Sequence, residues 1–149
     1  MGAAQTFNIA WLKEMVPLLN GVTYPDGRWI QVASTDEGIS IELESRWDKR
    51  NMEDEWTYFT ELCRESVPGQ QLEVVAGEGG LGTDGIVALI EGETNKPRWV
   101  LFIDWSNPFD RIEVVGEEIV AKTTVGTTWT INLFNPERLL CVTSSDSST

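Results

Sequence analysis

Histidine is absent from this chain of 149 residues, and cations are few. The missing histidines exclude a Ser–His–Asp triad, a Cys–His pair and every histidine-ligated metal site. Eleven Lys and Arg stand against 24 Asp and Glu, which gives a formal net charge of −13. Phosphate binding relies on Lys and Arg, and anionic membranes repel acidic proteins. We therefore expect neither nucleic acid nor a membrane as a direct partner.

Long hydrophobic runs are also missing. The apolar runs at residues 86–90 and 99–103 are strand-sized, far too short to cross a bilayer. The first six residues lack the charged and apolar regions of a secretory signal, although they fit the loose myristoylation pattern and leave lipidation of Gly2 open.

Only two cysteines occur, Cys63 and Cys141, and their spacing matches no zinc motif. We expect reduced, buried thiols in a cytoplasmic protein without a cofactor.

Apolar periodicity predicts an α+β fold, with two helices packed on one face of a mostly antiparallel β-sheet, a meander of about six to eight strands. The helices are expected over residues 6–19 and 51–66, where apolar side chains recur three or four positions apart. Short connections between the strands favour antiparallel pairing. Residues 1–143 are expected to form a single domain and residues 144–149 a disordered polar tail. The predicted strands cover residues 29–33, 39–44, 72–76, 86–91, 98–104, 111–115, 119–123, 127–134 and 140–143.

The negative charge is concentrated in one segment of the sequence. Residues 36–93 hold 15 Asp and Glu against four Lys and Arg. A surface of one sign speeds encounter with an oppositely charged partner, so the expected partner is a basic protein, a toxin or a nucleic-acid-binding enzyme. The predicted function is therefore non-enzymatic: an acidic binding protein that blocks this partner, like an immunity protein, an antitoxin or an inhibitor that mimics nucleic acid.

The predicted partner surface combines carboxylates with an aromatic anchor. Its residues are Trp47, Asp48, Glu53, Asp54, Glu55 and Glu61. Several of these carboxylates are close in sequence, but they lack the spacing of a calcium-binding EF-hand. We therefore expect no metal site.

An alternative hypothesis is a small-ligand or carbohydrate-binding β-rich domain that uses tryptophans at element ends. Asp104 and Trp105 follow an apolar run, and a glycine-rich loop at residues 77–85 accompanies them in this hypothesis. That loop lacks the Gly-Lys-Ser/Thr of a phosphate cradle, so we expect a mobile connection.

A carboxylate-only hydrolase that pairs Asp104 with Glu42 or Glu44 is a third alternative. The sequence does not tell whether the protein is a homodimer, or which partner it binds.

Overall fold

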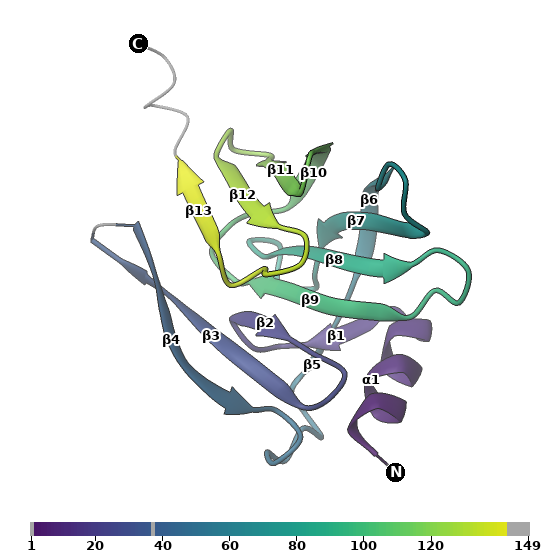
Figure 1. Ribbon diagram of the computed structural model, residues 1–149. Helices are drawn as coiled ribbons and strands as arrows, with labels where there is room; N and C mark the ends of the chain where they lie inside the picture. The colour runs from purple at the N-terminus through teal and green to yellow at the C-terminus, as the bar shows by residue number, and fades with distance from the viewer. Residues whose placement is uncertain (1, 37, 143–149) are drawn as a thin grey trace.

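The described part of the chain folds into one helix and thirteen strands. The computed structural model describes residues 2–36 and 38–142, so the expected disordered tail at residues 144–149 lies outside the described residues. The strands form three antiparallel sheets of seven, four and two strands (Figure 1). The elements are α1 (Ala3–Leu12), β1 (Met15–Pro17), β2 (Gly21–Thr23), β3 (Arg28–Thr35), β4 (Gly38–Arg46), β5 (Trp56–Tyr58), β6 (Thr60–Ser66), β7 (Leu72–Glu78), β8 (Gly85–Glu91), β9 (Pro97–Ile103), β10 (Phe109–Val115), β11 (Glu118–Thr123), β12 (Thr128–Asn132) and β13 (Leu139–Val142).

The seven-stranded sheet is the central layer, in the order β4-β3-β2-β9-β8-β7-β6. Its middle strands are apolar on both faces, because successive side chains of a strand point to opposite sides. Along β8, Val87 and Leu89 enter one hydrophobic cluster, whereas Ile86 and Ile90 enter another. A sheet of this kind has to be covered on both faces.

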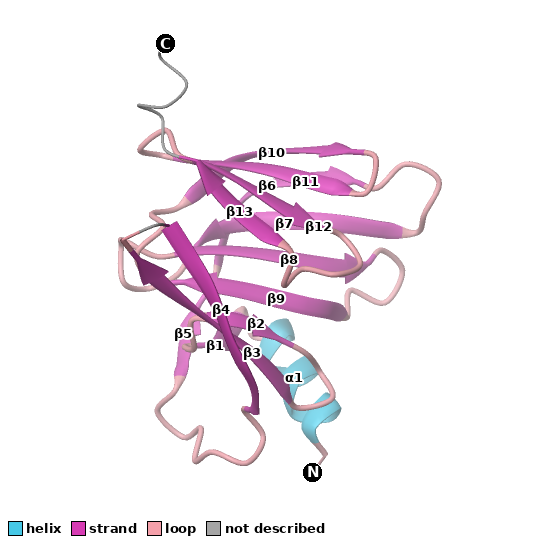
Figure 2. Cartoon of the chain, turned by 60° about the vertical axis from the view of Figure 1, so that its left-hand side comes forward, coloured by secondary structure: helices cyan, strands magenta, loops and turns pink. Residues whose placement is uncertain are grey.

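The four-stranded sheet β10-β11-β12-β13 covers one face of the central layer, as Figure 2 shows. Its inward side chains include Phe109 and Trp129, whose rings meet edge to face at 6.1 Å. The Tyr24 hydroxyl, in the turn after β2, donates a hydrogen bond of 2.8 Å to Glu137 in the β12–β13 connection. Burial, and then this hydrogen bond, raise the pKa of Tyr24. The two sheets are thus linked by a polar contact as well as by their shared core.

The opposite face is covered by α1 and by the two-stranded sheet of β1 and β5. Phe7 and Trp11 lie one turn apart on α1, so both point from the same side of the helix into the core. Trp11 stacks on Phe59 at 5.2 Å, and Phe7 packs on Trp47 at 5.5 Å. An aromatic cluster therefore fixes the helix on the sheet.

The predicted α+β fold, with two helices on one face of a single sheet, was wrong: the described residues form a mostly β structure of one helix and three antiparallel sheets. Residues 51–66 form a loop followed by β5 and β6. Apolar positions in this segment do recur at helical spacing, but the run from Trp56 to Thr60 is entirely aromatic or β-branched and prefers a strand. β6 also gives β7 its ladder partner on that side of the sheet. Strand propensity and pairing with β7 therefore outweighed the helical spacing of the apolar residues.

The N-terminal helix is shorter than the predicted residues 6–19. α1 ends at Leu12, and Glu14 adopts a φ of 59°, a left-handed conformation that stops the helix. Pro17, which has no N–H for the ladder, ends the short strand β1. The nine predicted strands are confirmed in position, since they overlap β3, β4 and β7 to β13.

The core between the two larger sheets gives a stability prediction. Leu101 of β9 is 0% exposed, whereas Leu140 of β13 is 68% exposed. We expect Leu101→Ala to lower the free energy of unfolding by about 3 kcal/mol, because it leaves a cavity. Leu140→Ala is the matched control and should change it by less than about 0.5 kcal/mol. Urea unfolding measures both, and equal losses would contradict the described packing.

Candidate functional site

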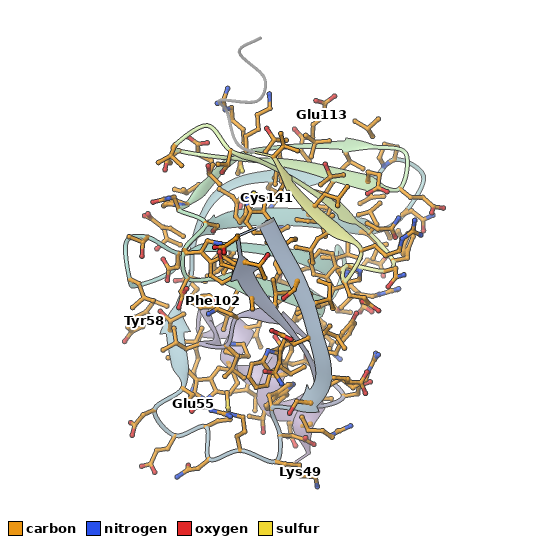
Figure 3. The ribbon with its side chains drawn as sticks, turned by 90° about the vertical axis from the view of Figure 1, so that its left-hand side faces the viewer. Lys49, Glu55, Tyr58, Phe102, Glu113 and Cys141 are labelled. Atoms are coloured by element: carbon orange, nitrogen blue, oxygen red, sulfur yellow. The ribbon has the colours of Figure 1, made fainter. Side chains whose placement is uncertain are left out.

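The predicted acidic residues lie in one short part of the sequence, between residues 48 and 61. Asp48, Glu53, Asp54 and Glu55 lie in the loop between β4 and β5, and Glu61 follows on β6. Figure 3 shows Glu55 on this loop, which also carries Lys49, with Tyr58 further along the same side of the molecule. We call residues 48–61 the acidic segment.

Three carboxylates of the acidic segment are engaged by arginines of the same chain. Asp48 accepts two hydrogen bonds from Arg46, at 2.9 and 3.1 Å. Glu55 accepts two from Arg50, at 2.9 and 2.6 Å. These arginine hydrogen bonds hold the pKa of Asp48 and of Glu55 below the ordinary values. Much of the negative charge at these two positions is therefore compensated.

Glu61 is engaged in the same way. Arg64 donates to both of its oxygens, at 3.0 and 2.7 Å, and also contacts Glu73 on the neighbouring strand. Arg64 is thus held between two carboxylates, and this arrangement raises its pKa further. Glu61 therefore contributes less free charge than the sequence suggests.

Glu53 and Asp54 differ from their neighbours in the acidic segment. Both side chains are exposed, and neither makes an ion pair within the described part of the chain. The loop that carries them is anchored, because the Arg50 guanidinium that binds Glu55 also lies 5.4 Å above the Trp29 ring. Two free carboxylates are thus presented on a fixed loop.

Trp47, the predicted anchor, lies in the core. It is 2% exposed, and its indole nitrogen donates a 2.7 Å hydrogen bond to the Tyr24 carbonyl oxygen. The exposed aromatic residue within the acidic segment is Tyr58, at 68% exposure. The alternation of Trp56, Thr57 and Tyr58 would have pointed to it, had this segment been predicted as a strand.

Arginine pairing extends over the whole described surface. Six of the seven arginines form ion pairs with carboxylates of the chain; the exception among residues 2–36 and 38–142 is Arg138. The pair of Arg111 and Asp110 is the longest, at 3.9 Å. Six of the eleven cationic side chains are thus engaged internally, whereas the four lysines make no ion pair among the described residues.

The structure brings the alternative site residues, Asp104 and Trp105, close to the glycine-rich loop. The Thr83 hydroxyl donates to the Asp104 carbonyl oxygen at 3.0 Å, and the Asn107 N–H donates to the Thr83 carbonyl oxygen at 2.8 Å. The Asp104 carboxylate is exposed, whereas Trp105 is half-buried and lines a groove. The turn after β9 and the loop before β8 therefore form one unit.

The glycine-rich loop is held by a buried carboxylate, in contrast to the expected mobile connection. Asp84 is 0% exposed and accepts hydrogen bonds from the N–H groups of Gly79, at 3.0 Å, and Leu81, at 3.3 Å. A side chain at Gly79 would collide with the Asp84 carboxylate, and one at Gly85 would collide with Asn107. These glycines permit close backbone approach.

Among the described residues, no three acidic or cysteine side chains gather as metal ligands. Among the same residues, no helix has the length and hydropathy to cross a membrane. Cys63 and Cys141 are free and half-buried.

The buried carboxylate gives a second prediction. Asp84→Ala should lower the free energy of unfolding by about 2–3 kcal/mol, because two loop N–H groups lose a charged acceptor. Asp84→Asn should cost less, since it retains one acceptor oxygen. Asp104→Ala removes an exposed carboxylate from the adjoining turn and serves as the control. Urea unfolding compares the three variants, and a loss no larger than the control's would show that Asp84 does not hold the loop.

Thiol reactivity gives a third prediction. Burial raises the pKa of Cys63 to about 11, and the carboxylates of Asp110, Glu61 and Glu65 contribute. Because the thiolate is the reactive form, we expect iodoacetamide to label Cys63 at pH 8 about a hundredfold more slowly than an unperturbed cysteine. Mass spectrometry of peptides measures the rate, with urea-unfolded protein as the control. Equally fast labelling in the folded protein would contradict the expectation.

Comparison with known proteins assigns no family to this chain. No protein-family model, no curated protein and no solved structure matches it. Its function therefore has to be argued from its own residues, charges and contacts.

Proposed function

We propose that this protein is a non-enzymatic binding protein whose acidic surface covers a basic site on another protein. Immunity proteins, antitoxins and inhibitors that mimic nucleic acid act in this way. The observation that carries the proposal is the pair of exposed, unpaired carboxylates of Glu53 and Asp54, with the exposed ring of Tyr58 four to five residues further along the chain.

The charge distribution supports this proposal. The net charge is −13, and six of the seven arginines are engaged within the chain. A basic partner that approaches the acidic segment therefore meets the unpaired carboxylates of Glu53 and Asp54, with Lys49 as the unpaired cation on the same loop. The summed field steers such a partner toward the surface and raises its association rate.

Tyr58 gives the acidic segment an anchor of the kind that interfaces favour. Binding energy at an interface is concentrated on a few aromatic or arginine side chains, and charges around them set orientation and rate. Tyr58 lies four residues from Asp54 and five from Glu53, so their backbones are at most about 18 Å apart. One partner patch of ordinary size can therefore cover Tyr58, Glu53 and Asp54 together.

The expected mode of action is steric. Enzymes that act on nucleic acid bind phosphates with clustered Lys and Arg. Carboxylates held on a fixed loop offer the same cations an alternative set of acceptors. A partner whose phosphate-binding cations are occupied in this way cannot engage its substrate.

Charge reversal tests the proposal. The double variant Glu53→Lys with Asp54→Lys should slow association with the basic partner by about tenfold at low salt and flatten its salt dependence. Glu93→Lys with Glu117→Lys changes the net charge equally at exposed positions outside the acidic segment, so it should keep most of the affinity. Tyr58→Ala should mainly raise the dissociation rate.

The measurement is affinity capture from the source lysate by all four proteins, with washes at low and high salt. A basic protein retained by the wild type and the control pair, but lost from the Glu53 and Asp54 pair, supports the proposal. An empty eluate, or equal retention by both double variants, contradicts it.

A further inference from the structure

A groove lies at the end of the molecule where the tip of the β3–β4 hairpin faces the four-stranded sheet. Its volume is about 480 Å³, within the usual range for small-molecule sites. Segments far apart in the sequence form its walls: Asp36 and Ile39 from the hairpin, Trp105 from the turn after β9, Trp129 from β12 and Cys141 from β13. Figure 3 shows Cys141 beside this end of the hairpin.

The lining of the groove disfavours anions. It contains no Lys or Arg within the described residues, and its one charged side chain is Asp36. Asp36 is exposed and makes no ion pair in the described chain. An acidic protein of net charge −13 adds to the same preference. Charge therefore favours a cationic occupant.

The aromatic lining fits a substituted ammonium group. Trp105 is half-buried at the groove, and Trp129 lies at its inner side with 1% exposure. Indole rings attract ammonium groups through the negative charge density of their faces, and tryptophan does so best. Methyl groups on the nitrogen also bury apolar surface against Ile39.

Trp129 contributes a second, independent observation. Its indole N–H is buried and has no hydrogen-bond partner among the described residues. Buried N–H groups nearly always find an acceptor, so an orphaned one requires an explanation. Because Trp129 also lines the groove, we take an oxygen of an occupant as the acceptor that this N–H lacks.

We propose that this groove binds a small organic cation that carries a substituted ammonium group and a nearby hydroxyl or carbonyl oxygen. Trp105 and Asp36 hold the ammonium group, and Trp129 donates to the oxygen. This proposal is independent of the acidic segment, because the two regions share no residue. It assigns a ligand to the groove and no reaction.

The test uses choline and its neutral isostere 3,3-dimethylbutan-1-ol, which replaces the ammonium nitrogen by carbon. Calorimetric titration of the full chain should show saturable choline binding, with the neutral compound weaker by at least about fivefold. Methyl glucoside is the third ligand, because a saccharide is the rival occupant for tryptophan-lined grooves.

Variants assign the binding to this groove. Asp36→Asn should weaken choline by about threefold to tenfold and leave the neutral isostere unchanged. Trp105→Ala should abolish choline binding, whereas Trp105→Phe should retain part of it. Glu117→Gln removes one exposed carboxylate elsewhere and should have no effect.

Three outcomes would overturn the proposal. The first is equal affinity for choline and its neutral isostere, which would remove the role of charge. The second is saturable binding of methyl glucoside with none of choline, which would assign the groove to a saccharide. The third is no saturable binding of choline up to about 10 mM, the weak end of specific affinities.

Discussion

The architecture depends on one constraint, the burial of β8 and β9 on both faces. Val100 and Phe102 point to one side of β9, and Leu101 to the other, and all three are at most 2% exposed. Neither the helix nor the four-stranded sheet alone can cover both faces, so the chain has to supply a layer on each side. The short α1 suffices because β1 and β5 complete its layer.

Because the interior is apolar, nearly all charged side chains lie on the surface, including the exposed edges of the sheets. β6 is the edge strand of the central sheet and is exposed along almost its whole length, with Glu61, Arg64 and Glu65 on it. Charged side chains keep such edges from pairing with other chains. That purpose is served by either sign. Protection of the edges explains why charged side chains lie on them. It does not explain why carboxylates outnumber cations more than two to one. This surplus of carboxylates is what favours a basic partner.

The sequence predicted the strands well because their apolar runs are short and bounded by turn residues. The prediction failed at residues 51–66, where apolar side chains have helical spacing but are of strand-forming types. Only the pairing of β6 with β7 shows that this segment is a strand and not a helix. That error hid Tyr58, and the place of Trp47 at an element end did not reveal that its side chain is buried. Ion pairs such as Arg64 with Glu61 and the convergence of segments at the groove depend on tertiary contacts, which a linear pattern does not contain.

The two proposed sites lie in the electrostatic field of the same acidic protein, but binding at each should depend differently on salt concentration. The acidic segment attracts a partner through the summed charge, which is screened beyond about 8 Å at physiological ionic strength. A cation inside the groove lies within contact distance of Asp36 and of an aromatic ring, where screening is weaker. Raising the ionic strength should therefore slow capture at the acidic segment strongly and weaken occupancy of the groove only slightly. Salt dependence thus separates an effect of net charge from recognition by particular residues.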